Sequence, residues 1–420
     1  MLGKKKELWG ITTFFNPVGY KNKKENYNKF RESSKKQGLK LLAVELVFDD
    51  NSFELVNSDA ERIIQIRTKK ENILWQKEAL LNIGLKKLPK NCDKVVWIDC
   101  DIIFENNDWV NKTSELLDQY CVVQPYSYSI KMCEGITKIK DHTKIPFGLE
   151  EMKYFHGIAY GVSQKGYGSL KEYIEHGHVG FVWAIRKKIL DKIGFYDSAI
   201  TGSGDLIMAG SFFNSQINYF KKKFSTKMIK HLENWSEKMS KEVKGSVYYI
   251  DGYIYHLWHG ETNDRKYDLR HSILKDNNFD PNIDITKDKN GIWEWSNNNI
   301  SIYKSLNRYF LERKEDNAFI NNNESINIST SFDNNFIKYF FSMANSILKN
   351  SNRKIIFFIL SRNLSDKNKI KLLGIQSSKK EVENFFKKVL CVIDNKIGLI
   401  RLFIKRKSPV FYLFLKKIKK

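Results

Sequence analysis

The stretch that most constrains the fold is Val95–Asp101, which reads VVWIDCD. Its first four residues are apolar and predict a buried strand, and two acids, Asp99 and Asp101, follow directly. On an extended chain, residues two apart face the same side, about 6 to 7 Å from each other. Two carboxylates that close repel each other unless a cation lies between or beside them. The stretch therefore predicts either a divalent-cation site or a solvated acidic turn.

The chain around this stretch alternates between strands and helices. Strands are predicted at residues 8–15, 39–48, 62–67 and 94–98, and helices at 23–37 and 72–87. Strands separated by helices of this length indicate an α/β fold with a parallel sheet, in which ligand-binding groups collect at the carboxyl ends of the strands. In that setting a cation site explains the two acids better than a turn does. We expect Mg²⁺ or Mn²⁺, because hard ions take oxygen ligands and bridge to phosphates.

The second half of the chain has weaker patterns. Strands are predicted at residues 179–184 and 247–256, and helices at 187–193 and 206–220. After residue 295 the composition shifts to Asn, Ser and Lys. We predict a main domain over residues 1–310, a linker over 311–330 and a basic, mostly helical region over 331–420.

Two further motifs contain side chains that can bind a metal ion or transfer a proton. The stretch YHLWHG at residues 255–260 contains His256 and His259, and a neutral imidazole is a good ligand for a divalent ion. We expect one of the two to bind the metal if the chain returns to the strand end, and the sequence does not distinguish between them. The stretch GSGDLIM at residues 202–208 places Asp205 at a helix start, either as an N-cap or as a general base that takes a proton from a hydroxyl.

These segments together resemble glycosyltransferases of the GT-A fold, over roughly residues 7–295. The resemblance rests on ITTFFNP at 11–17, WQKE at 75–78, DCD at 99–101, GFVWAIR at 180–186 followed by GD at 204–205, and HLWH at 256–259. The segments at 180–186 and 204–205 look like the acceptor-side region of galactosyltransferase C-terminal domains. The resemblance implies a mixed, mainly parallel sheet flanked by helices, a nucleotide-sugar donor (UDP-sugar above others), and a glycan or lipid-linked acceptor.

The resemblance also assigns roles on the donor side. It implies that Asp101 coordinates the cation and that Asp99 contacts the cation or the ribose. Nucleoside contacts would come from Thr12, Thr13 and Glu45. Two helix residues, Gln76 and Lys77, either reach the donor phosphate or ribose or are simply solvated, as is usual for a surface-facing Lys on a helix.

On the acceptor side, Gly204 and Asp205 would lie beside the attacking hydroxyl, with Asp205 in the place of the catalytic base. Relatives usually carry two or more acids after the glycines, whereas here Leu206 follows directly. The alternative bases are therefore Asp197 and Glu175. Trp183 is either a platform for a sugar face or a core residue.

Charge is concentrated in the tail. The chain has 71 Lys and Arg against 48 Asp and Glu, a net charge of +23, and residues 365–420 hold 16 basic and 4 acidic residues, a net of +12. A specific nucleic-acid partner would favour basic residues along the folded body, so none is expected. Apolar residues recur every three to four positions from Val382 to Ile404 and predict a helix bordered by lysines. Such a helix lies at an anionic membrane surface or packs on the main domain.

The five cysteines are scattered without a CxxC pair, and no secretory signal or membrane span is evident. We therefore expect a cytoplasmic protein, peripheral on the inner face of the plasma membrane. The predicted activity is metal-dependent sugar transfer from a nucleotide diphosphate donor to a hydroxyl, with inversion of the anomeric configuration. The alternatives are a nucleotide-sugar nucleotidyltransferase and a non-enzymatic polyanion-binding protein. In the first we would expect a glycine-rich first loop that ends in Arg.

Overall fold

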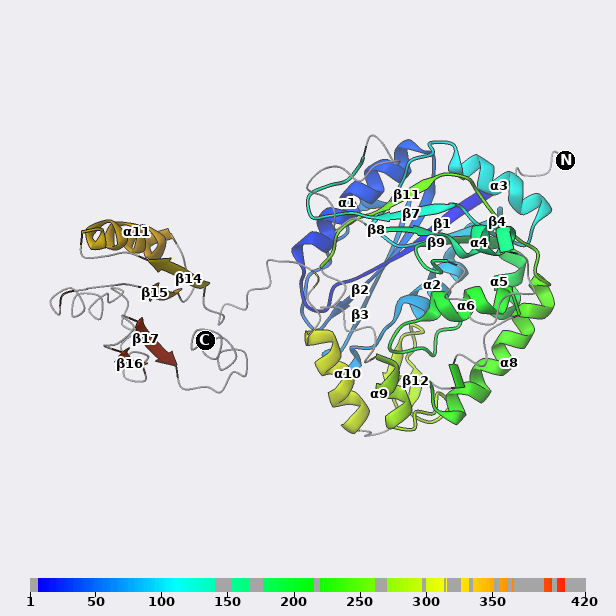
Figure 1. Cartoon of the computed structure of the whole chain (residues 1–420). Helices are drawn as coiled ribbons and strands as arrows, with labels where there is room; N and C mark the ends of the chain where they lie inside the picture. The colour runs from blue at the N-terminus through cyan, green and yellow to red at the C-terminus, as the bar shows by residue number, and fades with distance from the viewer. Residues whose placement is uncertain are drawn as a thin grey trace. The chain divides into compact units, whose positions relative to one another are not determined.

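The chain divides into two compact units, Met1–Phe319 and Ile320–Lys420 (Figure 1). The computed structural model describes residues 7–139, 153–165, 177–214, 220–221, 223–260, 270–296, 300–312, 315, 326–331, 335–350, 355–360, 365, 389–394 and 399–404. The division falls inside the predicted linker. Helix α10 (Ile300–Glu312) crosses the predicted end of the main domain, and strand β14 (Ile326–Ser331) begins before the predicted end of the linker.

The first unit is built on a seven-stranded sheet with the order β10-β6-β9-β4-β1-β2-β3. Its strands are β1 (Glu7–Phe15), β2 (Lys40–Phe48), β3 (Arg62–Thr68), β4 (Cys92–Ile98), β6 (Val122–Gln124), β9 (Val182–Arg186) and β10 (Val247–Tyr249). Strand β9 runs antiparallel to its neighbours β4 and β6, and the other pairings are parallel. The sheet is therefore mixed and mainly parallel, which confirms the predicted α/β class.

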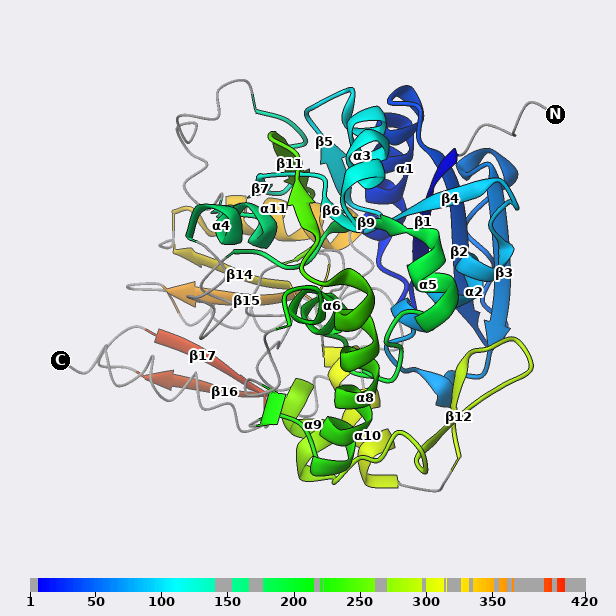
Figure 2. The same cartoon turned by 90° about the vertical axis from the view of Figure 1, so that its right-hand side faces the viewer.

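Helices cover both faces of this sheet because the central strands bury side chains on both sides. The helices are α1 (Lys21–Lys36), α2 (Lys77–Lys87), α3 (Trp109–Gln119), α5 (Lys187–Ile193), α6 (Gly204–Phe212) and α8 (Thr226–Val243). Apolar side chains of α1 and α3 share one core cluster, and those of α2, α5, α6 and α8 share another. In Figure 1, α1 and α3 lie along the top of this unit and α5, α6 and α8 lie at its right and lower right, and Figure 2 shows the same elements turned by 90°.

A second sheet brings distant segments to the end of strand β4. Its order is β5-β11-β7-β8, with bounds β5 (Ile102–Phe104), β7 (Tyr128–Lys131), β8 (Lys153–His156) and β11 (Tyr253–His256). The remaining described elements of this unit are η1 (Asn57–Asp59), η2 (Lys70–Asn72), α4 (Ile158–Lys165), α9 (Arg270–Asp276), β12 (Ile285–Lys287) and β13 (Trp293–Trp295). The single strand predicted over 247–256 is therefore two strands in different sheets, separated by Gly252 at φ +143°.

The helix predicted over residues 72–87 begins only at Lys77. Ile73 and Leu74 are buried ahead of it, and the backbone N–H of Trp75 donates to the carbonyl of Ile200 at 2.9 Å. Their apolar side chains are used in tertiary packing, which the helical spacing did not reveal. The predicted helix over 206–220 is described as α6, which ends at Phe212, and residues 215–219 lie outside the described part.

The second unit contains β14, α11 (Ile337–Asn350), β15 (Ile355–Leu360), β16 (Val389–Asp394) and β17 (Leu399–Ile404), with the sheet order β14-β15-β17-β16. The prediction of a mostly helical region is wrong for these described residues. The helix predicted from Val382 to Ile404 is replaced where it is described by the antiparallel pair β16 and β17. Short runs rich in Val and Ile satisfy strand and helix patterns alike, and here strand pairing prevails. None of the helices in the described ranges combines the length and apolarity that a bilayer crossing requires.

Candidate active site

A pocket of about 440 Å³ lies where strands β1 and β4 end. Thr13 and Phe15 line it from β1, and Asp99 and Asp101 line it from the residues after β4. The carboxyl edge of a parallel sheet is where open α/β folds place their ligands, because the loops after the strands diverge there. The acidic stretch predicted to matter therefore faces a cavity.

Strand pairing brings the two histidines to Asp101. Strand β11 pairs antiparallel with β5, and His256 stands opposite Ile102, the residue after Asp101. The backbone N–H of Leu257 then donates to the carbonyl of Asp101 at 2.9 Å. Both imidazoles approach the carboxylate, with Nε2 to Oδ2 distances of 3.6 Å for His256 and 3.4 Å for His259.

These three side chains form a group that fits a divalent ion. Their potential ligand atoms lie within 4.8 Å of one another, and the two Nε2 atoms are 3.0 Å apart. Ligand atoms about 2.1 Å from one ion, at angles between tetrahedral and octahedral, lie about 3.0–3.5 Å from each other. One carboxylate and two imidazoles suit Mn²⁺ among other divalent ions. The prediction left open which histidine belongs to the site, and the structure places both there.

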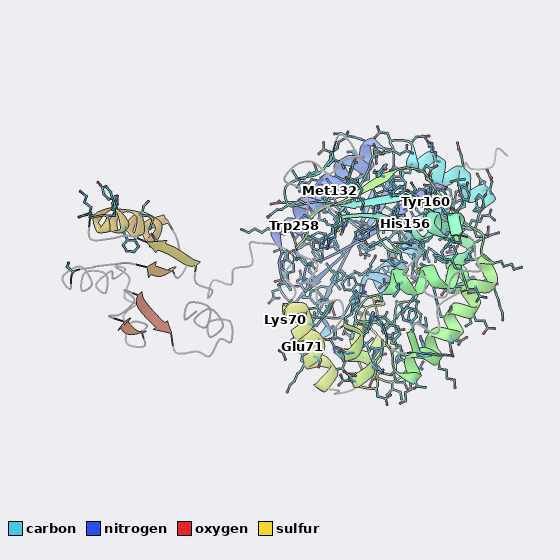
Figure 3. The ribbon with its side chains drawn as sticks, viewed as in Figure 1. Lys70, Glu71, Met132, His156, Tyr160 and Trp258 are labelled. Carbon is cyan, nitrogen blue, oxygen red and sulfur yellow. The ribbon has the colours of Figure 1, made fainter. Side chains whose placement is uncertain are left out.

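The loop that carries the histidines is fixed from both sides. Trp258 (labelled in Figure 3) offers its carbonyl to the side-chain amide of Asn26 in α1 at 2.9 Å. On the outer side, His259 Nδ1 lies 3.9 Å from Oε2 of Glu315. A carboxylate near the far nitrogen of an imidazole favours the tautomer whose other nitrogen can bind metal.

Asp99 takes a different partner from Asp101. Its Oδ1 lies 2.6 Å from the ammonium of Lys77, whose Nζ also lies 2.9 Å from Oδ2 of Asp205. Asp99 is not one of the three residues with closely grouped ligand atoms. Lys77 itself is buried, so its ion pairs with both acids are shielded from solvent. The structure thus separates the two acids of the DCD stretch between a metal-capable group and an ion-pair bridge.

Burial and the neighbouring charges shift the pKa values of Lys77, Asp99 and the adjacent Glu78. Burial alone would lower the pKa of Lys77, but the charges of Asp205 and Asp99 outweigh it and raise the pKa well above its usual range. Burial raises the pKa of Asp99, and Lys77 opposes that shift. Burial also raises the pKa of the neighbouring Glu78 to about 8, although Lys77 opposes the shift. Glu78 is therefore mainly protonated at neutral pH.

Gly204 is required by the close approach of Glu78. A Cβ added at Gly204 would lie 2.0 Å from Oε1 and 2.3 Å from Cδ of Glu78. Because Glu78 is only 3% exposed, its side chain has little room to move away. The glycine before Asp205 therefore lets a second acid, contributed by α2, lie against the start of α6.

We predict that Gly204→Ala lowers the free energy of unfolding by about 1–3 kcal/mol, the usual cost of an overpacked core. Urea unfolding measures this cost. In a Glu78→Ala background the clash is removed, so the same substitution should cost much less. An equal loss in both backgrounds would show that contact with Glu78 does not limit position 204.

His178 also lines the pocket, and no sequence signal pointed to it. Its ring stacks on Phe181 at 3.9 Å with an interplanar angle of 3°, and its Nδ1 accepts the backbone N–H of Gly180 at 3.1 Å. Burial, with a smaller contribution from His256, lowers the pKa of His178 to about 3. It is therefore a neutral imidazole at physiological pH.

Several predicted site residues have structural partners instead. The hydroxyl of Thr12 donates to the Ile98 carbonyl at 2.8 Å, and Trp183 is fully buried, which leaves it a core residue rather than a sugar platform. The amide of Gln76 holds both backbone groups of Trp293, at 2.8 and 3.1 Å. None of the three lines the pocket.

The alternative bases are also placed elsewhere. Asp197 accepts a hydrogen bond from Asn82 at 2.8 Å and pairs with Lys287, away from the pocket lining. Glu175 lies outside the described residues. Of the candidates within the described ranges, Asp205 is the one that lines the pocket.

A second pocket of about 440 Å³ lies beside the first and shares Pro17 and Val18 with it. It opens at the ends of β1 and β2 and is lined by Glu45 among others. The Glu45 carboxylate accepts the backbone N–H groups of Glu54 and Leu55 and the amide of Gln65. Its immediate role is therefore to hold the loop that walls this second pocket.

No protein-family model and no curated protein matches the chain. Among solved structures, it is similar to S. aureus TarS, at 11% identity and a TM-score of 0.32, over 64% of this chain and 40% of TarS. It is similar to glucosyl-3-phosphoglycerate synthase from Mycobacterium tuberculosis, solved with Mn²⁺ and UDP, at 10% identity and a TM-score of 0.35, over 64% of this chain and 77% of that one. A structure named for a glucose-1-phosphate thymidylyltransferase from Bacillus anthracis matches at 12% identity and a TM-score of 0.29, over 65% of this chain and 97% of that one.

Proposed function

We propose that the first unit is a metal-dependent glycosyltransferase that moves a sugar from a nucleotide diphosphate donor to a hydroxyl of a glycan or glycolipid acceptor. One observation carries this proposal. The metal-capable group of Asp101, His256 and His259 and the carboxylate of Asp205 line the same pocket. A cation site and a base on one cavity are what displacement of a diphosphate by a hydroxyl requires.

We infer that the donor occupies both pockets, which share Pro17 and Val18 in their linings. Mn²⁺ or Mg²⁺ held by Asp101, His256 and His259 would stabilise the charge that develops on the departing diphosphate. The nucleoside then extends past Pro17 and Val18 into the second pocket, which Glu45 helps to shape. Asp99 precedes the proposed metal ligand Asp101 by two residues, is held by Lys77, lines the same pocket and is suited to the ribose or the transferred sugar. We favour a UDP-sugar.

The chemical step follows from the position of Asp205. The acceptor oxygen forms a bond to the anomeric carbon while its proton passes to the Asp205 carboxylate. The bond between that carbon and the diphosphate oxygen breaks, and the electron pair leaves with the diphosphate. Glu78, which lies against Gly204 at the start of α6 and whose pKa burial raises to about 8, is mainly protonated and is not a second base.

A single displacement of this kind inverts the anomeric configuration. We therefore predict that an α-linked donor gives a β-linked product, which proton NMR of the initial product reads from the anomeric coupling. A product that keeps the donor's configuration would contradict the direct displacement.

The function is tested by a donor-hydrolysis and transfer screen over UDP-, GDP- and CMP-sugars with Mn²⁺. Released nucleotide is measured with and without EDTA. We expect turnover of one nucleotide class, and its loss when the metal is chelated. Absence of turnover with every donor, by protein whose fold is verified by circular dichroism, would refute the proposed function.

We further propose that the basic second unit places the enzyme on an anionic membrane surface at the cytoplasmic side. The support is charge alone, since residues 365–420 carry a net of +12. Each Lys near such a surface contributes about 1 kcal/mol. Changing Lys416, Lys417, Lys419 and Lys420 to Gln should therefore weaken binding to vesicles with anionic lipid by on the order of 1,000-fold. Unchanged co-sedimentation, or equal binding to neutral vesicles, would contradict this placement.

A further inference from the structure

Lys77 occupies a position that neither donor binding nor surface solvation explains. It begins helix α2, is 7% exposed, and lies between Oδ1 of Asp99 at 2.6 Å and Oδ2 of Asp205 at 2.9 Å. Asp99 directly follows β4, two residues before the proposed metal ligand Asp101, and Asp205 belongs to the first turn of α6. One buried ammonium thus links the donor side of the pocket to the candidate base.

We propose that Lys77 is a positioning residue for the transfer reaction, which fixes the carboxylate of Asp205 through Oδ2 and leaves Oδ1 to receive the acceptor's proton. This inference rests on the proposed function. Among the described residues, Oδ1 of Asp205 has no hydrogen-bond or ion-pair partner. An ionic hydrogen bond to one oxygen fixes the direction of the other, because the carboxylate is planar.

The surroundings of Lys77 argue against a phosphate-binding role. Three acids approach its charge, namely Asp205, Asp99 and Glu78. A phosphate that came close enough to bind Lys77 would also meet the carboxylates of Asp99 and Asp205, and like charges repel. The positive charge of Lys77 is therefore already compensated within the protein.

The ion pairs with Asp99 and Asp205 also explain why a charged lysine can be buried at this position. Removing the ammonium leaves two acids in a pocket wall without their shared cation, which costs more than losing a surface ion pair. Asp205 would then repel Asp99 and turn away, and a displacement of about 1 Å at a reacting group can cost about 100-fold in rate. A rate effect without a matching affinity effect is the signature of this role.

A double-mutant cycle tests the proposal on the full chain. Lys77→Met, Asp205→Asn and the double variant are compared by kcat for transfer and by the Kd of UDP with Mn²⁺. We expect Lys77→Met to lower kcat about 100-fold with Kd changed less than about 3-fold. In the Asp205→Asn background, the same change should lower kcat less than about 3-fold, because the group that Lys77 positions is already disabled. Altered UDP affinity in both backgrounds would show that Lys77 acts through Asp99 and not through Asp205, and would count against the inference.

Two results would overturn the inference. One is an equal loss of kcat from Lys77→Met in both backgrounds, and the other is a rise in Kd that accounts for the whole loss, which would make Lys77 a donor ligand. Lys94→Met is the matched control, because Lys94 is also buried (6% exposed) and paired, with Asp118 at 2.7 Å, but does not line the pocket. Its removal should affect stability and leave kcat within about 3-fold.

Urea unfolding keeps the inference testable if no donor is turned over. The shifts in unfolding midpoint caused by Lys77→Met and Asp205→Asn should not add, because each removes the same ion pair. Additive shifts would show that the two side chains do not interact, and would overturn the inference on their own. Absence of turnover with coupling intact would refute the proposed function while leaving the ion pair in place.

Discussion

Asp101→Ala is expected to lower metal-dependent turnover by on the order of 1,000-fold, comparable to the loss of an electrostatic stabiliser of a transition state. Asp101 is the carboxylate of the three-residue metal-capable group, and both imidazoles lie within 3.6 Å of its Oδ2. Without it, two neutral histidines remain, and a hard ion loses its anionic ligand. Turnover of the donor and calorimetric titration of Mn²⁺ both measure this effect.

Asp50→Ala is the matched control, since Asp50 is an exposed acid outside both pockets. It should keep the parent's turnover and its affinity for Mn²⁺. Asp101→Ala should also lose the response to added Mn²⁺ after EDTA treatment, whereas the parent regains activity. Full metal-dependent turnover in the Asp101 variant would remove the basis for placing the cation at this strand end.

Asp205→Asn is expected to reduce kcat by about 100- to 10,000-fold, the range that general-base catalysis contributes. The amide has nearly the same shape as the carboxylate but cannot accept the acceptor's proton. Because Asp205 is not one of the three metal-capable residues, the affinities for Mn²⁺ and UDP should stay within a few fold of the parent's. Steady-state kinetics with separate binding measurements distinguish the two effects.

Asp197→Asn provides the control for this second prediction. Asp197 was the alternative base, and in the structure it is held by Asn82 and Lys287 away from the pocket lining. Its amide variant should retain kcat within about 3-fold while losing some stability. The opposite pattern, with Asp197→Asn inactive and Asp205→Asn active, would exchange the two roles.

The sequence predicts the position of the candidate site where a local pattern determines the geometry. The apolar run before DCD predicts a buried strand that carries its acids to the carboxyl edge of the sheet, and β4 ends at Ile98 as predicted. The histidines were predicted as candidates from residue chemistry alone. That both approach Asp101 depends on the pairing of β11 with β5, which joins positions far apart in the chain.

Other features depended on tertiary contacts that no local pattern contains. Lys77 looks like an ordinary helix lysine, and only the approach of α6 gives it Asp205 as a partner. The adjacent Gln76 is also polar, yet its side-chain amide donates a hydrogen bond to the backbone carbonyl of Trp293 at the start of β13. In the tail, the apolar run that ends at Ile404 suits a helix as well as a strand, and the choice comes from pairing with β16.

The last helix of the first unit has a practical consequence. Phe310 in α10 stacks on Trp75 at 6.4 Å, and both Phe310 and Glu315 belong to the pocket lining. A shortened protein that stops at residue 310, where composition suggested an end, would cut α10 and discard Glu315. Expression of the first unit on its own should therefore extend to residue 319, so that the described lining of the pocket is retained.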